Sequence, residues 1–358
     1  MGTNCPRSCR VVFESCKPLV MTLKLSICIA TLNRAVYLRD TLINLKTQIT
    51  DGIEIILIDG ASTDETPQVA QEFQSQFTHF TYERLPQKGG VDQDYARAVE
   101  LARGDYVWLL TDDDVIKPGA IAMLLEVIHQ HHSLIILNAE VCNANLQDIL
   151  LPSRLTFSGQ RQYEAGLAEQ ARLLTEVGDY LSFIGGVIIR RDVWAERDKA
   201  RYFGTEFIHV GVIFQAPLPG SVLVIAEPYI SIRYGNAQWT LRSLEIWMFK
   251  WPSLIWSFTH LPVAARQSVT APEPWRRAQA LFLFRARGAY SEAEYQRLIK
   301  PRLTSFWQGL ILRAIAHLPG CLTNLLASLY ASIRRLRPLT VDLRQSPFDY
   351  RACFRRRL

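Results

Sequence analysis

Blocks of apolar residues alternate with polar turns over the first two thirds of the chain, and each block predicts one element. Short runs rich in β-branched residues predict buried strands, whereas apolar residues three and four apart predict helices. The predicted strands cover residues 23–30, 53–58, 78–84, 104–110, 134–138, 183–191 and 221–227. The predicted helices cover residues 35–47, 67–77, 95–102, 120–131 and 167–177, with others beginning near Asp192 and Phe203. This alternation predicts an α/β fold with a doubly wound, mostly parallel sheet.

Polar turns follow three of the predicted strands, around Asn33, Asp59 and Asp112. The carboxyl ends of the strands meet at one edge of a doubly wound sheet, and such folds bind their ligands at that edge. We therefore expect the three turns to lie close together and to form a nucleotide-binding site.

The turn after the central strand contains three consecutive carboxylates, Asp112, Asp113 and Asp114. Clustered carboxylates repel one another, and a divalent cation compensates for this repulsion. Oxygen ligands of this kind suit Mg²⁺ or Mn²⁺ bridging the phosphates of a ligand. The alternative is a solvated acidic turn in which Asp114 caps the next helix. The neighbouring turns at Asn33 and Asp59 favour the cation site.

The composition is that of a globular protein: 358 residues, 49% hydrophobic, with a net charge of +6. This length allows one large domain or two. Lys and Arg are spread through the chain, which favours an anionic ligand or a membrane surface as the partner. The basic residues form no stripe with interleaved aromatic residues, so a nucleic-acid partner is disfavoured.

Seven cysteines form no CxxC pair, and three of them (Cys5, Cys9 and Cys16) crowd the N-terminus. An odd number without a framework predicts reduced thiols and a cytoplasmic location. Residues 1–22 contain no uninterrupted apolar segment of the signal-peptide type. We expect them to be a disordered leader outside the fold.

The last third of the chain changes in character and predicts a helical region over residues 231–335 and a basic tail over 336–358. A stripe of tryptophans is consistent with either a packed core or a membrane anchor. Residues 314–333 carry no formal charge, but His317, Pro319 and Gly320 interrupt them, which predicts two packed or interfacial helices instead of one membrane span. The nearby arginines are consistent either with attraction to anionic lipid or with a simple solvated tail. The tryptophans are Trp239, Trp247, Trp251 and Trp256, and the arginines are Arg334, Arg335, Arg337, Arg355, Arg356 and Arg357.

Three segments resemble the motifs of family 2 inverting glycosyltransferases, which have the GT-A fold. They are Ser26–Arg34, Ile56–Thr66 and Gly104–Asp114. Within that family, Gly89–Tyr95 is similar to the branch that contains abequosyltransferases. The resemblance implies that residues 23–230 are a Rossmann-like GT-A catalytic domain and that the helical region is a C-terminal extension.

The resemblance also implies roles for individual residues. Nucleotide-sugar binding falls to Thr31, Asn33, Arg34, Asp59, Asp92, Asp94 and Asp112. Asp113 and Asp114 correspond to the metal-binding positions for Mn²⁺ or Mg²⁺, although Thr111 occupies the place of the usual first Asp. Glu206 is the candidate general base, with His209 in reserve, because Phe207 stands where a second acid is common.

The implied reaction moves a sugar from a nucleotide-diphosphate donor to an acceptor hydroxyl with inversion. The implied acceptor is a lipid-linked or O-antigen-like glycan, reached by peripheral contact with the inner face of the plasma membrane. Two other functions stay open. One is a magnesium-dependent nucleotidyl or phosphoryl transferase, against which stands the lack of a Gly-rich Lys-Ser/Thr phosphate loop. The other is a non-catalytic sugar-binding protein that retains the fold.

Overall fold

The computed structural model describes residues 23–236 and 240–355. The predicted leader (1–22), Trp239 and the arginines at 356 and 357 lie outside the described residues.

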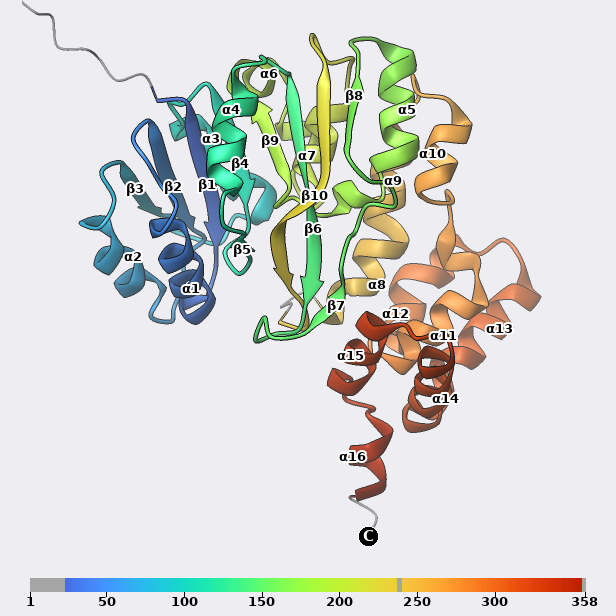
Figure 1. Ribbon diagram of the computed structural model, residues 1–358. Coiled ribbons are helices and arrows are strands. Elements are labelled where there is room, and N and C mark those ends of the chain that lie inside the picture. The colour runs from blue at the N-terminus through green and yellow to red at the C-terminus, as the bar shows by residue number, and fades with distance from the viewer. Residues whose placement is uncertain (1–22, 237–239, 356–358) are drawn as a thin grey trace, which may run out of the picture.

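A single sheet of ten strands organises residues 25–233 (Figure 1). Its strands follow the order β3-β2-β1-β4-β9-β6-β10-β5, and β7 and β8 pair with β6 and β10. The sheet is parallel from β3 to β4, and β9 then runs antiparallel between β4 and β6. The bounds are β1 (Leu25–Thr31), β2 (Ile53–Asp59), β3 (Phe80–Arg84), β4 (Tyr106–Leu110), β5 (Val115–Ile116), β6 (Leu134–Cys142), β7 (Ile149–Leu151), β8 (Gln160–Tyr163), β9 (Val187–Arg190) and β10 (Val222–Arg233).

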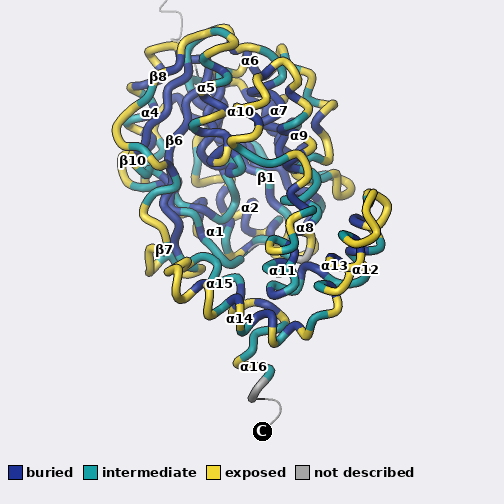
Figure 2. Tube along the Cα trace, turned by 90° about the vertical axis from the view of Figure 1, so that its right-hand side faces the viewer, coloured by how far each residue is buried: buried dark blue, intermediate teal, exposed yellow. Residues whose placement is uncertain are grey.

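Helices flank this sheet and bury its apolar strands, as the alternating pattern predicts (Figures 1 and 2). Every side chain of β2 and β4 is buried, which explains why these strands are continuous apolar runs. The predicted α/β class with a mostly parallel sheet is confirmed. The helices are α1 (Ala35–Lys46), α2 (Thr66–Gln74), α3 (Val91–Leu101), α4 (Ala120–Ile128), α5 (Leu167–Val177), α6 (Arg191–Ala195) and α7 (Ile208–Phe214).

Several boundaries differ from the predicted ones. Helix α3 begins at Val91, four residues earlier than expected, because Gly90 makes the preceding turn with a positive φ of 116°. Strand β10 continues to Arg233 through a bulge at Pro228. The predicted strand 183–191 is a strand only from Val187. Gly186, just before it, packs so closely against the Leu137 carbonyl that a Cβ atom would not fit.

The C-terminal third is helical and has a core of its own. Leu244, Trp275 and Leu281 belong to that second apolar cluster. Its helices are α8 (Ser243–Glu245), continued by a π-helix (Ile246–Lys250), then α9 (Trp251–Ser257), α10 (Val263–Val269), α11 (Ala278–Ala286), α12 (Glu292–Glu294), α13 (Phe306–His317), α14 (Gly320–Ile333), α15 (Arg337–Gln345) and α16 (Tyr350–Arg355). The predicted basic tail is therefore largely helical.

Two residues of the tryptophan stripe, Trp247 and Trp251, lie in the core or pack against it. Trp247 and Trp251 pack on Phe207, with ring centroids 5.7 and 4.7 Å from it. This contact joins the helical region to the sheet domain just before α7, and the core interpretation of the stripe holds for these two residues.

Two short helices replace the uncharged stretch, as predicted. Within the described parts of the chain, no single helix has the length and apolar character needed to cross a bilayer. Helices α13 and α14 reach that length and character only as a pair, and the pair is bent by 95°.

The prediction of reduced cysteines is wrong for two of them. Cys321 in α14 and Cys353 in α16 form a disulfide, with 32 residues of sequence separation. Cys28 and Cys142 are free and buried. The pairing could not be read from the sequence, because it depends on the fold bringing α16 back against α14.

Candidate active site

The polar turns meet at the carboxyl edge of the sheet, as the strand order requires. Thr31 at the end of β1 lies in register with Asp59 at the end of β2. Asp112, two residues beyond β4, accepts a hydrogen bond of 2.7 Å on Oδ2 from the Thr31 hydroxyl. The predicted juxtaposition of Thr31, Asp59 and Asp112 is therefore present.

Arg34 is the countercharge of the acidic turn. Its guanidinium forms an ion pair with Asp113, and its Nε lies 3.6 Å from Asp112 Oδ1. Asn236 stands beside this group: its side-chain amide donates to Asp113 Oδ2 at 2.7 Å, and its carbonyl accepts from Arg34 at 2.7 Å. The Tyr37 ring lies 4.4 Å from the guanidinium and supports it by a cation–π contact.

The three carboxylates of the acidic turn occupy different environments. Asp114 is buried, and accepts hydrogen bonds from the Thr111 hydroxyl and from the Arg233 backbone N–H. Burial, followed by the neighbouring Asp113 charge, raises the pKa of Asp114 well above its usual range. Asp114 therefore holds the turn against β10, and its oxygens have partners within the protein.

Asp112 and Asp113 are more open. Burial and the Asp113 charge raise the pKa of Asp112 to about 7, although Arg34 and Thr31 oppose this. Asp113 keeps its Oδ1 free of hydrogen bonds from any residue that the structure describes, since Arg34 and Asn236 both contact Oδ2. Nowhere in residues 23–236 and 240–355 do three or more His, Cys, Asp or Glu side chains converge as metal ligands. One or two carboxylates completed by ligand phosphates are nevertheless a usual Mg²⁺ donor set, and Asp112 and Asp113 fit it.

Asp59 is buried and held in one orientation. It accepts from the Ser62 N–H at 2.7 Å and from the Tyr82 hydroxyl at 2.9 Å, and Arg84 lies 3.7 Å away. Asp94, in the first turn of α3, approaches the same place: a Cβ added to Gly60 would lie 3.0 Å from its Oδ2.

Asp94 is the unusual member of this pair. It is 5% exposed, and its Oδ1 is buried without a hydrogen-bond partner among the described residues. Burial, then the Asp59 charge, raises the pKa of Asp94 to about 6. A buried acceptor without a partner beside Asp59 is an atom that a ligand N–H or O–H can satisfy.

Asn33 organises the turn between β1 and α1. It adopts a left-handed conformation with φ of 55°, and its side-chain carbonyl accepts from the Thr63 N–H at 2.7 Å. Its own N–H donates to the Ser62 hydroxyl at 2.8 Å. Asn33 thus ties the turn after β1 to the turn after β2.

Asp92 holds the start of α7. Its two oxygens accept from the backbone N–H groups of Glu206 (2.8 Å) and Ile208 (2.9 Å). Glu206 has a positive φ of 72°, an uncommon conformation for a residue with a Cβ. The first turn of α3 therefore positions Glu206 through Asp92 and lies beside Asp59 through Asp94.

The two candidate bases lie in opposite surroundings. Glu206 is partly exposed and forms ion pairs with Arg242 and with Lys250, whose Nζ is 2.9 Å away. His209 is 1% exposed, and its Nε2 donates to the Leu181 carbonyl at 2.7 Å. Burial lowers the pKa of His209 to about 4. His209 is thus a neutral, enclosed side chain, whereas Glu206 is accessible.

Sequence reasoning missed the residues that complete this site from the far end of the domain. Asn236 and Arg233 contact the acidic turn, and Arg242 and Lys250 contact Glu206. Arg233 is the last residue of β10, which pairs with β6, and the other three follow β10 in the sequence. None of them belongs to a recognisable motif. Only the polar residues that terminate the long apolar strand could have drawn attention to Arg233.

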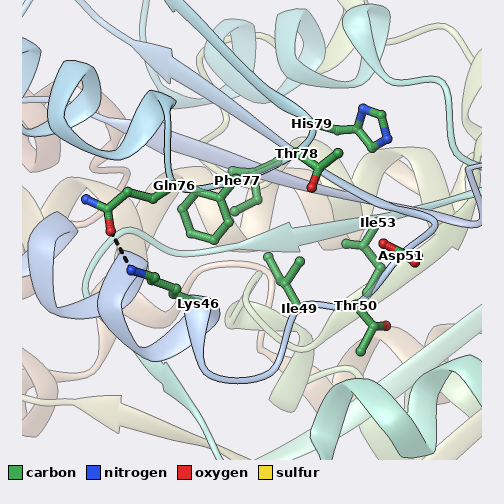
Figure 3. A pocket seen from close by; sticks show the side chains of 10 residues that line it. Lys46, Ile49, Thr50, Asp51, Ile53, Gln76, Phe77, Thr78 and His79 are labelled. Atoms are coloured by element: carbon green, nitrogen blue, oxygen red, sulfur yellow. Dashed lines mark hydrogen bonds between the residues drawn. The ribbon is translucent and has the colours of Figure 1, made fainter.

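A cavity of about 140 Å³ lies at the opposite edge of the sheet (Figure 3). It opens between the end of α1 and the starts of β2 and β3, and Lys46 and Gln76 hydrogen-bond at its rim. Ligand pockets for molecules of nucleotide size measure roughly 300–1,000 Å³. This cavity is too small for such a ligand, and it is remote from the carboxylates.

The mostly parallel sheet with acidic residues at its carboxyl edge is the arrangement in which open α/β folds bind their ligands. Residues 26–192 match the family model for glycosyl transferase family 2. This part of the chain is therefore similar to the family 2 glycosyl transferases.

Relatives share this domain over different lengths. Abequosyltransferase RfbV of Salmonella typhimurium is 27% identical over 227 residues, which is 59% of this chain and 67% of that protein. The GalNAc(5)-diNAcBac-PP-undecaprenol beta-1,3-glucosyltransferase of Campylobacter jejuni is 30% identical over 112 residues, which is 31% of this chain and 36% of that protein. The chain therefore spans only about a third of the second relative.

A solved structure extends the likeness to the helical region. Residues 1–349 of S. aureus TarS, in complex with UDP, superpose with a TM-score of 0.51 at 16% identity. The superposition covers 94% of this chain and 92% of that one. At this identity the match shows a shared fold, including C-terminal helices.

Proposed function

We propose that this chain transfers a sugar, with inversion, from a nucleotide-diphosphate donor to the hydroxyl of a lipid-linked glycan. The observation that carries the proposal is the cluster at the carboxyl edge, in which Arg34 lies between Asp112 and Asp113 with Asp59 on the neighbouring strand. The family 2 model over residues 26–192 supports the class of reaction.

The donor's base is assigned to the buried pair of acids. Asp59 accepts a base N–H, and the partnerless Oδ1 of Asp94 is available for a second contact. Thr31 and Asn33 shape the turn around the base, and Arg34 supplies positive charge toward the diphosphate.

Asp113 and Asp112 are the residues that would hold Mg²⁺ or Mn²⁺. When bound, the cation offsets negative charge on the departing diphosphate. Asp114 has a different task, because its oxygens are engaged by Thr111 and Arg233. It fixes the loop that presents its two neighbours.

Glu206 is the proposed general base. It removes the proton from the acceptor hydroxyl while that oxygen bonds to the anomeric carbon, and the bond to the diphosphate oxygen breaks with its electron pair on the opposite face. Attack from the face opposite the departing diphosphate inverts the anomeric centre. Such proton transfer contributes on the order of 10²- to 10⁴-fold in rate. Arg242 and Lys250 orient the carboxylate, and an acceptor hydroxyl replaces one of them on binding.

The names of the relatives and the character of the helical region support the proposed acceptor and location. One relative is named an abequosyltransferase, and another is named for a substrate linked to undecaprenol. These names support a lipid-linked glycan acceptor and peripheral contact at the cytoplasmic face of the membrane. The Mg-dependent nucleotidyl transferase and the non-catalytic sugar-binding protein remain the rival functions.

A donor panel separates these functions. The purified protein is incubated with CDP-, UDP-, TDP- and GDP-sugars and a lipid-linked oligosaccharide, with mass-spectrometric readout of free nucleoside diphosphate and of the product. The proposal expects both products together. Release of sugar 1-phosphate instead, with the nucleoside monophosphate transferred, would identify a nucleotidyl transferase, and binding without turnover would identify the non-catalytic function.

A calorimetric arm tests the base contact in the same protein. Asp59→Ala should weaken binding of the preferred donor by about ten- to a hundredfold, since a charge-assisted hydrogen bond is lost. Asp51→Ala, at the other end of β2, serves as the matched control and should leave affinity unchanged. Equal affinity of Asp59→Ala and wild type would exclude the assignment.

A further inference from the structure

On helix α14 the large apolar side chains face outward and the small or polar ones are buried, the opposite of what is usual for a helix at a protein surface. Its buried positions are small or polar, and Asn324 there donates to the carbonyls of Ala286 and Leu343. Its large apolar residues point outward instead. They are Leu322, Leu326, Leu329 and Ile333, spaced i, i+4, i+7 and i+11, and they are 48–80% exposed. This spacing places all four on one face of the helix.

Helix α13 has an apolar face of the same kind. Gly309, Leu312 and Ala316 face the second core. Trp307, Leu310 and Ile311 lie on the opposite side and are exposed, and Trp307 is 72% exposed. We call these three side chains, together with Leu322, Leu326, Leu329 and Ile333 of α14, the outer apolar face.

The formal charge within α13 is positive and α14 carries none, while Glu292, which precedes both helices, pairs with Arg313 of α13. No Asp or Glu occurs between Glu294 and Asp342. Arg334 and Arg335, at the end of α14, are exposed and form no ion pair with any residue that the structure describes. An apolar helix face bordered by unpaired arginines complements an anionic lipid surface, because apolar burial and the attraction of basic groups act together. A second copy of this chain is a poorer occupant, since a symmetric contact would bring like charges together.

The dimensions favour a helix pair lying in the interface. With 12 and 14 residues at about 1.5 Å each, α13 and α14 are roughly 18 and 21 Å long, whereas a bilayer core measures about 30 Å. Their bend of 95° prevents them from acting as one straight span. Trp307, near the start of α13, has the amphipathic ring that is enriched at membrane–water interfaces.

Helices α14 and α15 lie at the same end of the molecule as the candidate active site. Helices α14 and α15 lie at the end where β7 is found (Figures 1 and 2). Gln345 in α15 donates to the Gly235 carbonyl at 2.7 Å, next to Asn236, which contacts Asp113. Docking there would bring the carboxyl edge of the sheet toward a lipid-borne acceptor.

We infer that the outer apolar face of α13 and α14 inserts into the interface of an anionic phospholipid bilayer. The inference supplies a partner for the proposed transferase, and vesicle binding can be measured whether or not transfer occurs. It also moves the membrane contact away from Trp247, Trp251 and Trp256, which lie in the core or pack against it, and onto residues that begin at Trp307.

The test uses the full chain and sedimentation with phosphatidylglycerol vesicles. Leu326→Glu combined with Leu329→Glu should lower vesicle partitioning by roughly tenfold or more, because two apolar side chains no longer leave water. Trp307→Glu tests α13 in the same way. The matched control is Leu167→Glu with Val263→Glu, two exposed apolar residues on α5 and α10, which should bind as wild type.

Further measurements make the outcome decisive. Arg334→Gln with Arg335→Gln should weaken binding to phosphatidylglycerol vesicles but leave the weak binding to phosphatidylcholine vesicles unchanged. Circular dichroism checks that each variant is folded, and donor affinity reports on the sheet domain separately. Wild-type protein that ignores vesicles overturns the inference. If sedimentation velocity then shows a dimer that Leu326→Glu with Leu329→Glu dissociates, a second copy covers this face; if it shows a monomer, neither a bilayer nor a second copy covers it.

Discussion

At the scale of single residues, the site distinguishes carboxylates that the sequence presents as equivalent. Asp112, Asp113 and Asp114 are consecutive, yet only Asp113 keeps an oxygen without a partner among the described residues, and only Asp114 is enclosed. The resemblance pointed to Asp113 and Asp114 as metal ligands, and we now assign the cation to Asp113 with Asp112. Sequence could not decide the matter, because the answer depends on Arg233, which lies more than a hundred positions away.

The first prediction concerns the metal. Asp113→Asn removes the charge of the open carboxylate while keeping its shape, so turnover should fall by roughly a hundredfold or more. The thermal midpoint should stay near that of wild type, and Mn²⁺ affinity in the presence of nucleoside diphosphate should fall in parallel. Asp105→Asn, at an exposed carboxylate at the other end of β4, is the control. Full activity of Asp113→Asn in excess chelator would rule out a metal-assisted reaction.

The second prediction concerns Asp94 and pH. Its pKa is about 6 in the folded protein against an ordinary 3.8, so the folded state binds the proton more tightly than the unfolded chain. The contribution of Asp94 to the free energy of unfolding is therefore fully present below about pH 4 and is lost as the pH rises through about 6. Asp94→Asn should be more stable than wild type above about pH 7, on the order of 2 kcal/mol, with the two curves converging in acid.

Urea unfolding across this pH range measures the effect, and nucleotide calorimetry shows what it costs in function. Asp51→Asn, at an exposed carboxylate on the opposite edge, should follow wild type at every pH. If Asp94→Asn gains no stability above neutral pH, the burial argument for this carboxylate fails. If Asp94→Asn also binds the donor with wild-type affinity, Oδ1 of Asp94 does not contact the donor.

The third prediction separates the two candidate bases. Glu206→Gln should lower kcat by about 10²- to 10⁴-fold with little change in donor affinity. His209→Gln keeps an amide donor for the Leu181 carbonyl and should retain most activity. The variant should differ from wild type in how its free energy of unfolding depends on pH. Because the pKa of His209 is low, its contribution to stability is present above about pH 6.5 and is lost as the pH falls toward 4. A larger loss of kcat in His209→Gln than in Glu206→Gln would reverse the assignment.

At the scale of elements, helix α3 connects the two halves of the proposed site. Asp92 and Asp94 stand in its first turn, so one helix positions Glu206 through Asp92 and places the Asp94 carboxylate near Gly60, the residue after Asp59. Sequence predicted a glycine turn at this point and began the helix at Tyr95. The helix begins at Val91 because Gly90 turns the chain, and this earlier start gives both aspartates helical geometry.

The fourth prediction tests that connection. Asp92→Ala removes both acceptors from the start of α7, so stability should fall by about 0.5–2 kcal/mol, as for a lost helix cap. Glu206 is displaced with its backbone, so kcat should fall while donor affinity changes little. Asp92→Asn, which keeps one acceptor, should recover part of both losses. A variant with lower stability but wild-type kcat would limit Asp92 to a structural role.

The elements that the sequence predicted well are those with strong local patterns. Strands β1, β2 and β4 and helix α5 appear within two residues of their expected ends, because their apolar runs or helical spacing are bounded by turn residues. Their carboxyl ends supplied Thr31, Asp59 and Asp112. The sequence could not predict the roles of Asn236, Arg242 and Lys250. Their place at the site depends on how β10 and the π-helix bring the chain back to the carboxyl edge of the sheet.

At the scale of the whole molecule, the helical region is an integrated part of the structure. The Cys321–Cys353 disulfide holds α16 against α14, and Leu343 of α15 packs with Ala327 and Ala331 of α14. Removal of residues 334–358 would therefore expose the inner face of α14 as well as delete basic residues. Point variants of the outer apolar face are the cleaner test of membrane binding.

The last prediction concerns this disulfide. Closing a loop of about this length restricts the unfolded chain and contributes roughly 2–4 kcal/mol. The second core and the sheet are distinct clusters, so the effect of Cys353→Ser should be local. Hydrogen exchange should speed up in α14, α15 and α16 while β1, β2 and β4 keep their protection. Thiol reductant should reproduce this pattern in wild type and add nothing to the variant, whereas identical exchange in oxidised wild type and Cys353→Ser would show that packing alone holds α16 in place.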